Sequence, residues 1–109
     1  AGAGGAATLT ATMSLLAESL LGEFTLQKSM EKPRLHHGGW PDVVLAEETV
    51  PQSIVAGLRA KGDEVATVPV LGRLNAAECP LGIDSNIEEI ACFVNTDLRG
   101  FGLAAEAER

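Results

Sequence analysis

Two adjacent histidines, His36 and His37, are the side chains of this chain best suited to metal binding or proton transfer. They lie in the segment 32–42 with the only tryptophan and two of the five prolines. Neighbouring residues of an extended chain point to opposite sides, so both rarely bind one metal ion. No cysteine or carboxylate stands at a zinc-like spacing from them. We therefore predict no metal site, with one imidazole packed inside and the other facing a cleft or solvent.

The segment 32–42 is predicted to be an ordered loop. Pro33 and Pro41 each lack a backbone N–H, fix φ and bias the preceding residue away from helix. The segment should therefore end one helix and begin an extended stretch. Rare multifunctional side chains gathered in a loop indicate function more strongly than the same residues in a core.

Gly4 and Gly5 precede the first predicted helix. Glycines in that place expose backbone N–H groups that bind an anion or stabilise an oxyanion. The alternative is a flexible chain end. The chain has no Gly-x-Ser-x-Gly or Cys-His-Asn pattern, and Ala1 offers no N-terminal nucleophile. We expect no complete nucleophilic site within these residues.

Asp97 and Arg99 precede Gly100 and Gly102 in a short loop. An Asp-x-Arg pair can lock a loop through charge-assisted hydrogen bonds, and this structural role is the one we expect.

Cys79 and Cys92 flank a turn-rich stretch. If 74–79 and 87–95 form a hairpin, the two cysteines lie opposite or diagonal to one another, where a disulfide is possible. Two buried thiols in a reducing compartment are the alternative. No basic residue adjoins either cysteine, so neither is expected to be a catalytic thiolate.

The composition describes one domain or a piece of one. A hydrophobic fraction of 46% is globular, and a formal net charge of −7 argues against nucleic acid or an anionic membrane as partner. No apolar run approaches the roughly 20 residues of a membrane span. The chain begins without Met and without an intact signal peptide, so we expect that it was cut from something larger.

Three helices are predicted. Residues 8–21 have the spacing of an amphipathic helix, and 26–31 follow Thr25 as N-cap. The third has Pro51 in its first turn, preceded by Thr49 or Val50, and ends at Lys61-Gly62. The apolar positions assigned to the first helix are Leu9, Met13, Leu16, Ala17, Leu20 and Leu21, and those of the third are Ile54, Val55, Leu58 and Ala60.

Strands are predicted at 43–46, 64–70, 74–79 and 87–95, and the residues 47–49 are expected to interrupt the first. The fold class is α+β: two helices, a strand, a helix, then a small antiparallel sheet.

The stretch Pro33-Arg34-Leu35-His36-His37 resembles the γ-glutamyltransferase family, also called γ-glutamyltranspeptidase or glutathione hydrolase. The resemblance runs nearly end to end, to the C-terminal part of the family's small subunit. The motifs that follow the family's order are Gly4-Gly5, the helix 9–21, Gly22-Glu23-Phe24, Lys32 to His37, Pro41-Asp42, Glu47, Lys61-Gly62, Val65, Gly72, Asn75-Ala76 and Asp97-Leu98-Arg99-Gly100.

The resemblance implies the N-terminal nucleophile hydrolase fold, an αββα sandwich made from a self-cleaving precursor, with helices first and then mostly antiparallel strands. It implies a Thr nucleophile outside this chain, with Gly4 and Gly5 supplying oxyanion-hole N–H groups. Pro33, Arg34, His36, His37, Asp97 and Arg99 would then be structural motif residues. The implied partners are the rest of the precursor or large subunit and a γ-glutamyl substrate, with no cofactor.

On this view residues 1–109 are a C-terminal segment that is inert alone. Bacterial members of the family are commonly periplasmic, which would suit a disulfide, and the sequence leaves periplasm and cytoplasm open. Lys32, Asn75 and Leu98 depart from the family's Ala, Gln and Pro, which allows an altered substrate. Two alternatives are a standalone non-catalytic α+β interaction module and a metal-binding module using His36 and His37.

Overall fold

The computed structural model of the chain describes residues 1–82 and 92–103. Within them helices and strands are mixed along the chain, which confirms the α+β class, and none of these helices is long and apolar enough to cross a membrane. The helices are α1 (Ala7–Leu20), α2 (Leu26–Glu31) and α3 (Gln52–Ala60). The strands are β1 (Gly2–Ala3), β2 (Leu35–His37), β3 (Val44–Glu47), β4 (Val65–Val68), β5 (Arg73–Glu78) and β6 (Phe93–Thr96).

The first sheet has the order β1-β5-β6 and is antiparallel throughout. Helices α1 and α2 cover one face of it, because the inward side chains of β5 pack against apolar residues of both helices. The buried cluster at this contact consists of Ala11, Leu15, Leu26, Met30 and Leu74. The opposite face of β5 is exposed at Asn75 and Ala77.

The second sheet has the order β2-β3-β4. Strands β2 and β3 are antiparallel, whereas β3 and β4 are parallel. The parallel pair departs from the predicted antiparallel sheet. It arises because α3 lies between the two strands in the chain, and a helical crossover returns the second strand in the direction of the first. The buried residues under α3 are Ala46, Val50, Val55 and Val65.

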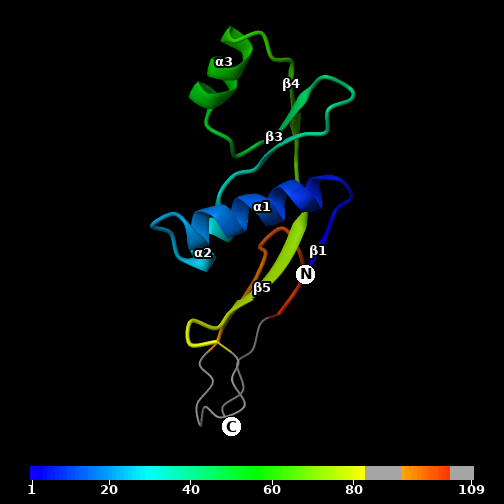
Figure 1. The fold of residues 1–109 in the computed structure, drawn as a ribbon. Helices are drawn as coiled ribbons and strands as arrows, with labels where there is room; N and C mark the ends of the chain where they lie inside the picture. The colour runs from blue at the N-terminus through cyan, green and yellow to red at the C-terminus, as the bar shows by residue number, and fades with distance from the viewer. Residues whose placement is uncertain (83–91, 104–109) are drawn as a thin grey trace.

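Figure 1 shows α1 crossing the middle of the molecule, with the second sheet and α3 at one end and β5 running to the other. The short link 69–72 joins β4 to β5, so the two sheets follow one another along the chain. Each sheet has its own apolar cluster. Polar contacts described below connect the two sheets.

The helix boundaries agree with the local signals. Thr25 accepts a hydrogen bond from the N–H of Lys28 at 3.3 Å and so caps α2. Pro51 was expected in the first turn of α3 but is its N-cap, so the helix begins one residue later. The helix ends before Lys61 and Gly62, as expected, and Gly62 has a φ of 101°.

The apolar face assigned to the first helix is wrong. The buried residues of α1 are Ala7, Ala11 and Leu15. The helix approaches the chain just before β5 so closely that a Cβ at Gly72 would lie 3.3 Å from the Cβ of Ala11. Small side chains are needed at such a contact, so the larger ones face outward. The outward residues include Leu9, Met13, Leu16 and Leu20.

Other differences concern short strands. Residues 35–37 were predicted as part of a loop but form β2, and the pairing of Gly2–Ala3 with β5 was not predicted. Glu47 was expected to interrupt a strand but is the last residue of β3. The predicted strand 87–95 corresponds to β6 from Phe93, and its part 87–91 lies outside the described residues. Ile54, assigned to the buried face of α3, is exposed.

Candidate functional site

Gly4 and Gly5 form the turn between β1 and α1. Their φ angles are 129° and 63°, values that favour glycine at both positions. Within the described part of the chain, no residue accepts a hydrogen bond from the N–H of either glycine. Both residues are exposed, and their unpaired N–H groups lie at the N-terminal end of α1. Such groups are suited to a carboxylate or a developing oxyanion.

Gly4 is held against the backbone of Gly72. A Cβ at Gly4 would lie 2.7 Å from the Cα of Gly72, which no ordinary contact allows. Gly5 is different, because a Cβ there would meet nothing within 4 Å. The turn is thus fixed from one side by Gly72 and open on the other.

Thr8 adds a hydroxyl group to this corner. Its Oγ1 is buried and makes no hydrogen bond to any described residue. The same atom would lie 3.4 Å from a Cβ at Gly4. A buried hydroxyl without a partner is uncommon and needs an explanation, and a group bound at the glycine turn is one.

Arg34 fixes the other side of Gly72. Its Nη1 donates to the carbonyl oxygens of Leu71 and Gly72 at 3.1 and 3.2 Å, and its Nη2 donates to the carbonyl of Met30 at 3.3 Å. The residue is 7% exposed. Arg34 therefore ties the end of α2 to the segment that supports the glycine turn.

Arg34 belongs to a buried network of four charged side chains. Its Nη1 lies 2.8 Å from Oδ2 of Asp97, and Arg99 Nη1 lies 3.0 Å from Oδ1 of the same carboxylate. Arg99 also binds Glu47 with two parallel hydrogen bonds of 2.6 Å. Two cations face two anions, so the network is neutral, and a bidentate guanidinium–carboxylate pair is among the stronger polar contacts in proteins.

Backbone groups complete the bonding of both carboxylates. Glu47 accepts from the N–H of Arg34 at 2.9 Å and of Leu71 at 2.8 Å. Asp97 accepts from the N–H of Leu74 at 3.0 Å. Because Glu47 ends β3 and Leu74 belongs to β5, the network joins the two sheets.

The network lowers the pKa of both carboxyl groups. Burial alone would raise the pKa of Glu47 and Asp97, but the hydrogen bonds from Arg99, from backbone N–H groups and, for Asp97, from Arg34 outweigh it. Burial would lower the pKa of Arg99, and its two carboxylate partners raise it instead. All three groups are therefore held in their charged forms.

The two histidines lie on opposite sides of β2. His36 is buried, and its Nδ1 lies 2.8 Å from Oγ1 of Thr10 on α1. His37 is exposed: its Nδ1 accepts from the N–H of Gly39, so its Nε2 carries the proton that points to Asp42 Oδ1 at 3.1 Å. Among the described residues, no three histidine, cysteine or acidic side chains are grouped as metal ligands would be.

Cys79 and Cys92 are joined by a disulfide just beyond the paired ends of β5 and β6. The bond lies at the opposite end of β5 from the glycine turn, because β1 pairs with Arg73 and Leu74. The cysteines are therefore separate from the candidate site.

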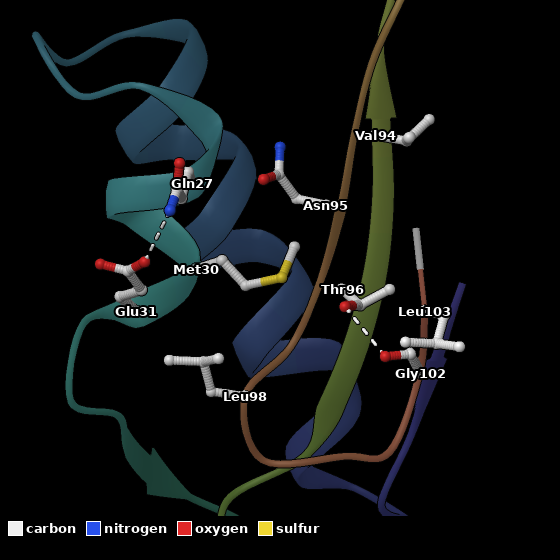
Figure 2. Close-up of a pocket in the computed structure, with 9 residues that line it drawn as sticks. All are labelled: Gln27, Met30, Glu31, Val94, Asn95, Thr96, Leu98, Gly102 and Leu103. Carbon is white, nitrogen blue, oxygen red and sulfur yellow. Dashed lines mark hydrogen bonds between the residues drawn. The ribbon is translucent and has the colours of Figure 1, made fainter. Parts of the chain in front are cut away.

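A pocket of about 230 Å³ lies between α2, β6 and the residues that follow β6 (Figure 2). Its polar side chains are partly paired among themselves, Gln27 with Glu31 and Thr96 with the carbonyl of Gly102. The pocket borders β6, whereas the glycine turn follows β1 on the other side of β5. The two sites are thus distinct.

The model of the gamma-glutamyltranspeptidase family matches residues 1–91. The chain belongs to that family. The match begins before the glycine turn and includes Arg34, both histidines and Glu47. No curated protein matches the chain.

Solved gamma-glutamyltranspeptidases share the fold. A mutant of the Helicobacter pylori enzyme is 21% identical with a TM-score of 0.77 over 91% of this chain. The Pseudomonas nitroreducens enzyme in complex with L-DON is 20% identical with a TM-score of 0.81 over 98%. The Bacillus anthracis transpeptidase CapD is 16% identical with a TM-score of 0.77 over 97%. The chain spans 52%, 53% and 61% of these three chains, and it has part of an N-terminal nucleophile hydrolase fold.

The structure thus brings together some of the residues selected from the sequence. Arg34, Asp97 and Arg99 meet in one network, and Gly4 reaches it through Gly72. His36 belongs to the contact between β2 and α1, whereas His37 and the cysteines lie apart. Glu47 was named among the family motifs but not as a site residue, and Thr8 was not named. A carboxylate that ends an apolar run was the available signal for Glu47, and no local signal marks Thr8.

Proposed function

We propose that the chain supplies the oxyanion-stabilising segment of an enzyme that cleaves or transfers γ-glutamyl amides. The N–H groups of Gly4 and Gly5 would stabilise the negative charge on the carbonyl oxygen when a nucleophile attacks it. The nucleophile, an N-terminal Thr by family resemblance, would lie outside these residues, so the chain alone would be inert. The γ-glutamyl substrate and the rest of the enzyme are its proposed partners.

The observation that carries the proposal is the pair of unpaired N–H groups at the start of α1. Family membership makes a γ-glutamyl amide the substrate class to test. The close approach of Gly4 to Gly72 and the positive φ angles of the turn support the proposal, because they restrict how far the turn can move. Donors that need no rearrangement during the reaction contribute most to stabilising the transition state.

The test measures release of p-nitroaniline from γ-glutamyl-p-nitroanilide by the complete gene product. Gly4→Ala should lower kcat about 100-fold or more, the loss typical of a displaced oxyanion donor. The physical reason is that the new Cβ has no room beside Gly72 and shifts the turn. Gly57→Ala is the control, because Gly57 is exposed in α3 and a Cβ there meets nothing within 4 Å.

Two results would contradict the proposal. One is a Gly4→Ala enzyme, folded by circular dichroism, that keeps the wild-type kcat. The other is measurable cleavage by residues 1–109 alone, which would contradict the inertness of the chain. A gene product that binds but does not cleave the substrate would favour the non-catalytic module instead.

A further inference from the structure

Helix α1 is apolar on two opposite faces. Ala7, Ala11 and Leu15 face the first sheet and are buried. On the other side, Leu9 is 70% exposed, Met13 61%, Leu16 44% and Leu20 67%. A surface helix normally carries charged or polar residues opposite its buried stripe, so an apolar outer face is typical of a helix that is covered on both sides.

The four outer residues form one stripe, which we call the outer stripe of α1: Leu9, Met13, Leu16 and Leu20. Their spacing of four, three and four residues repeats the pattern of a helix–helix seam. With about 100° of rotation per residue, they fall within an arc of about 60°. The stripe is therefore shaped to receive another helix.

The charges around α1 support the same interpretation. Glu18 is the only charged residue of the helix, and it pairs with Lys32 at 3.1 Å. No charged side chain of the helix therefore lies in the stripe. The helix lacks the charged outer face expected of one that meets water.

We propose that the outer stripe of α1 binds an apolar-faced helix from the part of the enzyme outside residues 1–109. The inference rests on the proposed function, since it assumes a larger enzyme. About half of the Helicobacter and Pseudomonas chains has no counterpart in this chain, which leaves ample polypeptide to supply that helix.

A second copy of the chain is a poorer occupant. Four side chains of about 100 Å² each bury roughly 400 Å² per partner. A stable interface between separate proteins needs about 800 Å² per partner. A helix that other contacts already hold in place binds at a high effective concentration, so the smaller stripe suffices for it.

The test places the photocrosslinker p-benzoylphenylalanine at Met13 in the complete gene product, followed by irradiation and peptide mapping by mass spectrometry. The expected crosslink joins position 13 to residues of the same gene product outside 1–109. The matched control carries the crosslinker at Gln52, which is exposed on α3. The crosslinker at Gln52 should not join to the residues that position 13 reaches.

Crosslinking of position 13 to a second copy of residues 1–109 would overturn the proposal, and so would no crosslink at all. Cleavage of γ-glutamyl-p-nitroanilide, measured on the same preparation before irradiation, separates the two hypotheses. An active enzyme without the crosslink would leave the proposed function standing and reject this interface. A crosslinked but inactive protein would support this interface and reject the proposed function.

Discussion

At the scale of single residues, Asp97 is the link that binds both arginines of the buried network. Its carboxylate lies 2.8 Å from Arg34 and 3.0 Å from Arg99, and its side chain is 1% exposed. A buried ion pair adds little relative to an apolar pair, but removing one partner leaves a charge buried without compensation. Replacing Asp97 should therefore change the stability of the protein by more than the net contribution of its ion pairs.

Asp97→Asn should lower the free energy of unfolding by about 3 kcal/mol, because two buried guanidinium groups lose a countercharge. Urea unfolding of the gene product measures the change. Asp42→Asn serves as the control, since Asp42 is 91% exposed and its contact with His37 lies at the surface. Equal midpoints for the two variants would show that the network does not stabilise the fold.

Thr8→Val tests the unpartnered hydroxyl at the glycine turn. The replacement keeps the shape and removes a buried polar group that has no partner among the described residues, so stability should stay the same or rise. If the hydroxyl contacts the reacting group, kcat for γ-glutamyl-p-nitroanilide should fall about tenfold, the effect of one neutral hydrogen bond. Thr12→Val is the control, because Thr12 Oγ1 donates to the Thr8 carbonyl within the helix. An unchanged kcat in Thr8→Val would remove Thr8 from the site.

At the scale of elements, the pairing of β5 with β6 is extended by the disulfide. Cys79 and Cys92 are 13 residues apart, and they follow the last paired residues, Glu78 and Phe93. The bond therefore acts on the end of the first sheet that lies farthest from the second sheet.

Replacing both cysteines by Ala should destabilise the protein by about 3 kcal/mol, the value for closing a loop of roughly this length. Thermal unfolding with and without dithiothreitol measures the effect. The reductant should lower the Tm of the wild type and leave the double variant unchanged. A wild-type Tm that does not respond to reductant would contradict the prediction. Activity should persist in the reduced protein, because the glycine turn pairs with the other end of β5.

At the scale of the whole molecule, the buried network is the main polar connection between the two sheets. Its carboxylates come from β3 and from the residues after β6, and its arginines come from before β2 and from the C-terminal loop. The charge state of Glu47 and Asp97 therefore affects the stability of the connection between the two sheets.

The protein should lose stability in acid. The pKa values of Glu47 and Asp97 are lowered below their ordinary values of 4.5 and 3.8. The unfolded chain takes up these protons first, so the stabilisation is complete above about pH 4.5 and is lost as the pH falls toward the lowered values. Tm measured between pH 6 and pH 3 should fall, and Asp97→Asn should flatten that fall. A Tm that rises below pH 4.5 would contradict the sign.

Much of the site was predictable from local signals, and part of it was not. Gly4 and Gly5 were identified because a glycine pair before a helix exposes backbone N–H groups that can bind an anion. Arg34, Asp97 and Arg99 were identified as motif residues, yet their common network was not, because their partners are distant in sequence. The local pattern at Glu47 indicated a break in a strand. It could not reveal that the distant Arg99 guanidinium group binds the Glu47 carboxylate.

The sequence by itself determined the helices, most of the strands and the family, because periodicity, capping residues and motif order are local properties of the chain. Only the tertiary structure decided which side of α1 is buried. Leu9, Met13 and Leu16 form the stronger apolar pattern, but the close approach of Gly72 admits only the small side chains of Ala7 and Ala11. Steric fit at that contact outweighed hydrophobicity, and it left the larger side chains facing outward.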